Sequence, residues 1–122
     1  MASIGSSIVS STDAGTHLLY KFDGVSVPTV DTLIVNETVG VGKVWRLRLL
    51  EGGCRAFGYF TVKVNSVVVA KSVTGPASEN VSFSWSPFYL AAASETVEVW
   101  YNQSYGPILD VSCFLFVTEL NT

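Results

Sequence analysis

The sequence predicts an all-β fold, a two-sheet antiparallel sandwich that is jelly-roll-like, and three observations predict it. The 122 residues include 19 valines and 15 aromatic residues, which are residue types enriched in strands. No window holds the 3.6-residue period of an amphipathic helix, whereas several stretches alternate apolar with polar residues, as half-buried strands do. Glycine and proline turns separate these stretches about every 8–12 residues, which is typical of sandwiches and jelly rolls.

The chain is expected to divide into an N-terminal arm, residues 1–15, and one sandwich domain, residues 16–122. The arm is dense in Ser, Gly and Ala, a composition that does not hold a fold by itself. Its spaced apolar residues are Ile4, Ile8 and Val9. We therefore expect an extended arm that becomes ordered only against a neighbour.

Within the domain, alternation identifies the strands in order. One further strand is expected over Val30 to Val39. The apolar sets expected to share a face are Leu18, Tyr20 and Phe22; Trp45, Leu47 and Leu49; Phe60, Val62 and Val64; Val81, Phe83 and Trp85; and Val97, Val99 and Tyr101.

The clearest pairing is a hairpin from Tyr59 to Lys71, with Asn65-Ser66 as its two-residue turn. Asn tolerates the positive φ that such turns require. This turn places Val64 opposite Val67, and Val62 opposite Val69. A slip by one residue would move the apolar row to water, so the register is expected to be well defined.

The last strand, Val111 to Val117, is apolar on both faces, with Cys113 and Leu115 on one side and Phe114 and Phe116 on the other. Such a strand is buried on both sides, by its own fold or by another subunit. Phe114 and Phe116 are therefore candidates for a subunit interface. The only cysteines, Cys54 and Cys113, lie in apolar stretches, and we expect them to be reduced and buried rather than joined in a disulfide.

Catalytic and metal-binding constellations are sparse. His17 is the only histidine, and no cysteine cluster or close carboxylate couple accompanies it. We therefore expect no enzyme activity, no metal and no cofactor. The absence of a basic patch argues against nucleic acid, and no apolar run approaches the ~20 residues of a membrane span.

Two groups of residues are candidates for binding. Trp100 is expected on the outward face of its strand, near Tyr101, Asn102 and Tyr105, and such aromatic and amide groups can bind sugar rings. The alternative is that Trp100 is covered by a loop or a subunit contact. Arg46 and Arg48 project from one face and could clamp a partner carboxylate; the alternative is a solvated pair.

The low charge indicates assembly. Only seven Lys and Arg and ten Asp and Glu occur, 14% of the chain, against about 25% in a typical soluble domain. Interface cores are depleted in charge and enriched in aromatic residues. We therefore expect a symmetric oligomer, or a subunit docked on a larger assembly.

Several segments between residues 43 and 119 carry a family resemblance. They are Trp45-Arg46-Leu47-Arg48, Cys54 to Val62, Thr74-Gly75-Pro76-Ala77, Asn80-Val81-Ser82-Phe83, Pro87, Thr96-Val97-Glu98-Val99 and Asn102 to Pro107. This part of the chain resembles small jelly-roll virion proteins of tailed bacteriophages. Ser66 departs from the glycine expected at the hairpin turn, and Ala93-Ser94 departs from a glycine before an acidic residue.

The resemblance implies a non-enzymatic structural role in the virion. The interpretation that we favour is a capsid decoration or cement protein that binds the major capsid protein and copies of itself. In it, Ile4, Ile8 and Val9 are the capsid contacts of the arm. One alternative is a receptor-recognition module of a tail or head fibre that binds a host glycan through Trp100, Tyr101 and Tyr105. Another is a tail or baseplate adaptor.

Overall fold

The structure is a computed structural model that describes residues 6–12, 15–26, 30–55, 57–75, 80–105 and 109–122. The described residues form nine strands and no helix. The strands are β1 (Ser6–Thr12), β2 (Gly15–Ser26), β3 (Asp31–Thr38), β4 (Lys43–Cys54), β5 (Phe57–Val64), β6 (Val67–Thr74), β7 (Asn80–Ala91), β8 (Thr96–Tyr105) and β9 (Leu109–Asn121).

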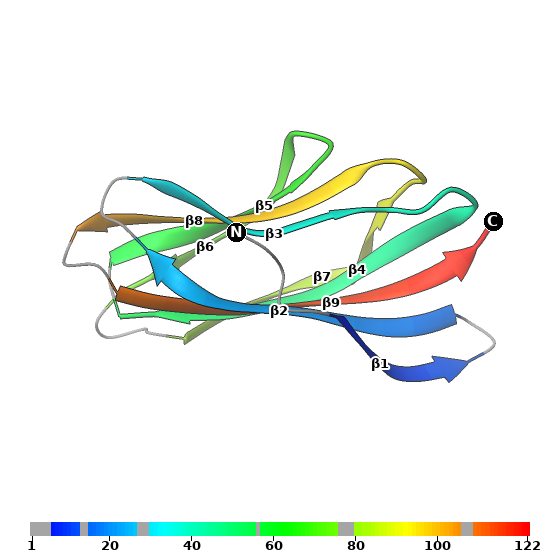
Figure 1. Ribbon diagram of the computed structural model, residues 1–122, viewed down its shortest axis with the longest axis horizontal. Helices are drawn as coiled ribbons and strands as arrows, with labels where there is room; N and C mark the ends of the chain where they lie inside the picture. Colours follow the sequence, from blue (N-terminus) through cyan, green and yellow to red (C-terminus); the bar gives the residue numbers. More distant parts are fainter. Residues whose placement is uncertain (1–5, 13–14, 27–29, 56, 76–79, 106–108) are drawn as a thin grey trace.

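The strands form two antiparallel sheets that lie one over the other (Figure 1). The five-stranded sheet has the order β1-β2-β9-β4-β7, and the four-stranded sheet has the order β3-β8-β5-β6. Without β1, the orders 2-9-4-7 and 3-8-5-6 are those of a jelly roll, in which consecutive strands alternate between the sheets except at the β5–β6 hairpin. The predicted fold class is confirmed.

The predicted arm is partly a strand of the sandwich. Residues 6–12 form β1, which pairs antiparallel with β2 through Ser6 opposite Tyr20 and Thr12 opposite Gly15. Residues 6–12 of the expected arm are thus extended and pair with the edge of the sandwich at β2. Ile8 and Val9 lie in this strand, with side chains outside the described part, and Ile4 lies outside the described residues altogether.

The core lies between the sheets and follows the alternation of the strands. Fully buried side chains come from both layers, including Leu47 and Leu115 from the five-stranded sheet and Phe60 and Val99 from the four-stranded sheet. Cys54 and Cys113 are both buried and free of a disulfide, as predicted. Cys113 and Leu115 therefore lie on the core side of β9, as expected.

One inward position in β4 was predicted wrongly. Trp45 and Leu47 are buried, but a bulge between Leu47 and Leu49 interrupts the pairing of β4 with both of its neighbours. An extra residue in a strand moves the following side chains to the opposite face. Leu49 is therefore half-buried on the outer face, and Leu50 takes the inward place.

The β5–β6 hairpin has the predicted turn and a different register beyond it. Asn65 and Ser66 have φ values of 50° and 70°, and Val64 pairs with Val67. A bulge then shifts the ladder, so that Val62 pairs with Ala70 instead of Val69. The bulge brings the small Ala70 into the core.

Candidate interaction surfaces

The outer face of the five-stranded sheet carries an apolar groove at its centre. Leu49, Phe114 and Phe116 line this groove together with Glu51, and it encloses about 270 Å³. Both rings project from β9, the middle strand of the sheet, and pairing places Leu49 beside Phe116 and Glu51 beside Phe114. Phe114 is 40% exposed. The structure therefore places the two predicted interface residues together on a surface that the described residues leave partly exposed.

Two arginines lie next to this groove and share one aromatic support. The guanidinium groups of Arg46 and Arg48 lie 4.7 and 5.5 Å from the centre of the Phe88 ring. Arg48 Nε also donates a hydrogen bond to Thr118 Oγ1 at 3.2 Å. Stacking and this hydrogen bond restrict the side chains, so the pair is held in place on the outer face, as a partner-binding pair requires.

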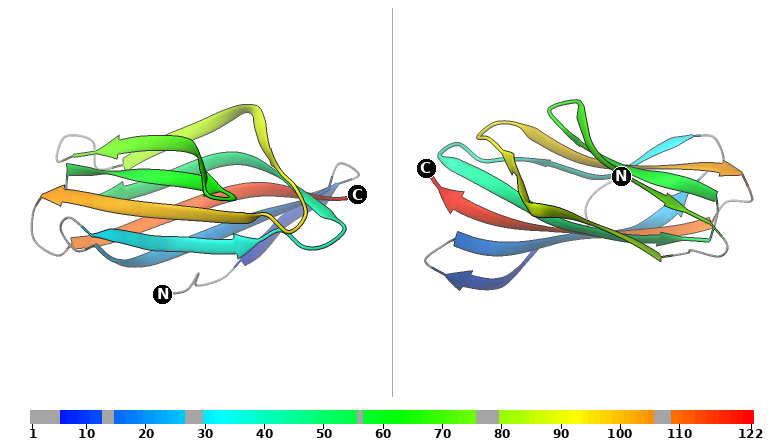
Figure 2. Two further views of the ribbon diagram at one scale, coloured as in Figure 1. Left: turned by 90° about the horizontal axis from the view of Figure 1, so that it is seen from above. Right: turned by 180° about the vertical axis from the view of Figure 1, so that it is seen from behind.

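The outer face of the four-stranded sheet is polar around a central tryptophan. Trp100 lies in β8, which runs between β3 and β5 (Figure 2, left). Lys63 Nζ is 5.5 Å from the centre of the Trp100 ring, and Lys71 Nζ is 4.1 Å from that of Tyr59. Trp100 is half-buried, and its Nε1 is buried without a hydrogen-bond acceptor among the described residues.

Asn102 shares this face one pair further along β8. Its Nδ2 donates to Asp31 Oδ1 at 2.6 Å, and it pairs with Tyr59 on the other side. Amide and carboxylate groups beside aromatic rings are suited to the hydroxyl groups and the ring face of a sugar.

Tyr101 does not belong to this surface, which corrects the prediction. It is 0% exposed and points into the core, because it alternates with the outward Trp100 and Asn102. Its hydroxyl is 2.7 Å from Thr74 Oγ1, and burial raises the pKa of Tyr101 above its ordinary value. Tyr105 is the last residue of β8, paired with Phe57, and its side chain lies outside the described part.

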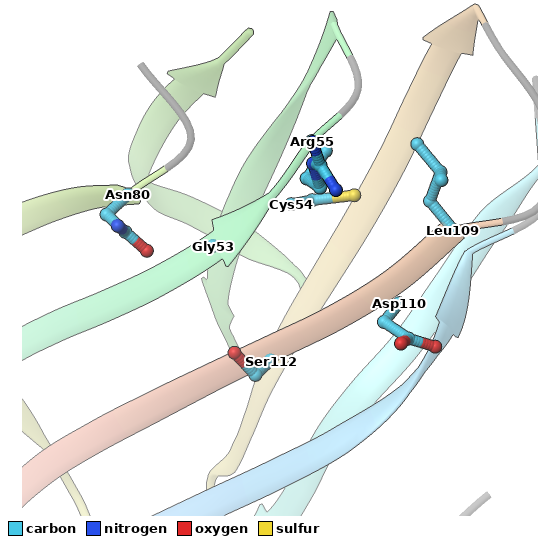
Figure 3. A pocket seen from close by; sticks show the side chains of 7 residues that line it. All are labelled: Gly53, Cys54, Arg55, Asn80, Leu109, Asp110 and Ser112. Atoms are coloured by element: carbon cyan, nitrogen blue, oxygen red, sulfur yellow. The ribbon is translucent and has the colours of Figure 1, made fainter. Parts of the chain in front are cut away.

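A pocket of about 330 Å³ opens at one end of the five-stranded sheet (Figure 3). Cys54 and Arg55 lie at the end of β4, Asp110 and Ser112 on β9, and Asn80 at the start of β7. The polar groups of this lining are one thiol, one hydroxyl, one amide, one cation and one anion, without a histidine. This set does not form a nucleophile–base pair of the kind that acyl transfer needs.

His17 has a packing role. Its Nδ1 is 3.0 Å from Thr118 Oγ1, and its ring centre is 6.2 Å from that of Phe116. Within the described ranges, no three His, Cys, Asp or Glu side chains gather as a metal site would require. The same part of the chain holds no helix long and apolar enough to span a membrane.

The sequence did not predict two residues of this surface, Leu49 in the groove and Phe88 beneath the arginines. Leu49 was expected in the core, and its outward position depends on a bulge that no residue of β4 marks. Phe88 follows Pro87 in a part of β7 that the ladder with β4 skips, between Ser84 and Tyr89. Proline cannot donate to a ladder, so Ser86-Pro87 was the available signal that pairing lapses here.

Comparison of the sequence with protein-family models and with curated proteins finds no match.

Proposed function

We propose that this chain is a non-enzymatic structural protein of a tailed-bacteriophage virion, a decoration or cement protein that self-associates and binds the major capsid protein. The observation that carries the proposal is the apolar groove of Leu49, Phe114 and Phe116 on the outside of a small jelly roll. Large apolar groups left uncovered at the centre of a sheet face mark protein–protein contact sites. The low charge of the chain supports the same conclusion.

The N-terminal strand supplies a second contact. β1 is the outermost strand of its sheet, so one of its edges has no partner strand in the described chain. An edge strand is a template on which another chain can add a strand. In this proposal the capsid protein pairs with β1, and Ile8 and Val9 contribute contacts.

The test is binding to the capsid of the phage that encodes the chain. We expect the full chain to sediment with capsids and a variant lacking residues 1–12 to remain in the supernatant. Quantitative mass spectrometry of virions should find hundreds of copies, as on a head surface. A handful of copies would instead indicate a tail or baseplate adaptor, and absence from virions would refute the proposal.

A second candidate function is glycan binding, favoured by Trp100 at the centre of the four-stranded sheet with Asn102 and Asp31 beside it. The test is a glycan array with the wild type and Trp100→Ala. A signal lost in Trp100→Ala but kept in Val73→Ala, an exposed position on β6 at the edge of the same sheet, would favour receptor recognition over decoration.

A further inference from the structure

The outer face of the five-stranded sheet has charges of opposite sign at its two ends, with the groove between them. Along β4 the outward residues run from Arg46 and Arg48 to Leu49 and then Glu51. The neighbouring β9 runs in the opposite direction and places the exposed Asp110 beyond Glu51. The face is therefore cationic at one end and apolar in the middle, and at the other end the two carboxylates of Glu51 and Asp110 outnumber the one described cation there, Arg55.

The register of β2 leaves this asymmetry in place. In the backbone register, Lys21 pairs with Phe114 and Asp23 with Ser112, two positions whose formal charges cancel. At the cationic end, β2 contributes His17, which hydrogen-bonds with Thr118. Neither addition reverses the sign of an end.

We propose that this face binds the same face of a second copy. The two copies are related by a two-fold axis that lies in the plane between their facing five-stranded sheets and runs perpendicular to the strands. A two-fold contact is isologous, so each residue pair across it occurs twice. With this axis the strands of the two copies run in opposite directions, and Arg46 and Arg48 of each copy lie over Glu51 and Asp110 of the other. An axis parallel to the strands would place arginines over arginines, and like charges facing each other oppose association.

The centre and the rim of the face suit this partner. Phe114 and Phe116 of the two copies meet at the axis, where the dominant contacts of an interface are usually found. The arginines are already positioned by Phe88 and Thr118, so less side-chain freedom is lost when they meet a carboxylate. This inference deepens the proposed function, because it names the surface through which the chain self-associates.

The decisive experiment combines two charge variants in sedimentation velocity of the full chain. The wild type should sediment as a dimer, twice the 13.1 kDa of one chain, at about 100 μM. Glu51→Arg reverses the charge nearest the groove at the anionic end, and Arg46→Glu with Arg48→Glu makes both ends anionic. Each variant alone should weaken self-association at least about tenfold, whereas an equimolar mixture should form a heterodimer.

Matched controls address the apolar centre and the direction of the strands. Phe114→Ser should abolish the dimer, whereas Val73→Ser, at a more exposed apolar position on the four-stranded sheet, should leave it unchanged. The fold of each variant is checked by its cooperative unfolding. In the variant R48K, a zero-length carbodiimide cross-link should join position 48 of one copy to Glu51 of the other.

The outcomes separate this inference from the proposed function. A wild type that stays monomeric, or a dimer unaffected by Glu51→Arg and Phe114→Ser, overturns the inference, while capsid binding can still hold. A dimer with the predicted rescue upholds the inference even if the chain does not bind capsids. A dimer of R48K in which position 48 forms no carbodiimide cross-link to Glu51 of the other copy would overturn the antiparallel arrangement.

Discussion

Gly58 in β5 is confined by the backbone of the neighbouring strand. A Cβ at this position would lie 2.3 Å from the backbone oxygen of Asn102 and 2.6 Å from the Tyr101 hydroxyl. We expect Gly58→Ala to lower the free energy of unfolding by about 3 kcal/mol, at the upper end of overpacking effects, because a backbone atom cannot rotate away. Urea denaturation measures the change.

Gly40→Ala is the matched control for this substitution. The nearest atom to its Cβ would be Lys43 Cγ at 3.5 Å, which is ordinary contact. The free energy of unfolding should change by no more than about 0.5 kcal/mol. Equal losses in the two variants would contradict the close packing at Gly58.

The carboxyl group of Glu37 in β3 titrates above its usual pKa of 4.5, because burial disfavours its charged form. The folded state then binds its proton more tightly than the unfolded state, so this group lowers stability as pH rises through and above that range. Glu37→Gln should raise the free energy of unfolding at pH 7 by less than about 1 kcal/mol, since solvent screens a half-exposed group.

The pH dependence distinguishes this cause from a change in packing. The advantage of Glu37→Gln should shrink as the pH falls towards 4, where the carboxyl group of the wild type is mostly protonated in both states. Thermal unfolding at pH 4 and pH 7 provides the measurement. An advantage of the same size at both pH values would be inconsistent with desolvation.

At the scale of the element, the β5–β6 turn carries backbone strain. Ser66 has a φ of 70°, a conformation that glycine adopts without the steric cost of a Cβ. We expect Ser66→Gly to raise the free energy of unfolding by about 0.5–1 kcal/mol, because two-residue turns of this kind favour Asn-Gly. Ser82→Gly, at an exposed position within β7, should instead destabilise, and a gain in both variants would argue against relief of strain.

The strands also show where the alternation of apolar and polar residues no longer predicts which side chains face the core. Alternation placed Val97, Val99 and Tyr101 inward correctly, and the Asn65-Ser66 turn correctly joined two strands. The errors at Leu49 and Val69 both follow bulges, at Arg48 and near Lys63. A bulge bends its strand and increases the local twist, and its position depends on how the whole sheet pairs. The residues around a bulge therefore do not indicate its position in the sequence.

At the scale of the whole molecule, the eight strands β2–β9 complete the jelly roll without β1. Removal of residues 1–12 should therefore leave a cooperatively folded domain, with a loss of stability of about 2 kcal/mol or less, the range of ordinary local changes. Circular dichroism during thermal unfolding measures it. A broad, non-cooperative transition would show that β1 belongs to the folding unit and not only to its edge.

Residue composition and alternation alone determined the all-β class, the two-sheet sandwich, the inward sides of β8 and β9 and the burial of the cysteines. They could do so because the alternation of buried and exposed side chains is a property of each strand's own sequence. Only the tertiary structure decided that residues 6–12 pair with β2 and that Leu49 joins Phe114 and Phe116 on the outer face. These features depend on pairing between segments distant in sequence, and on the bulges that pairing imposes.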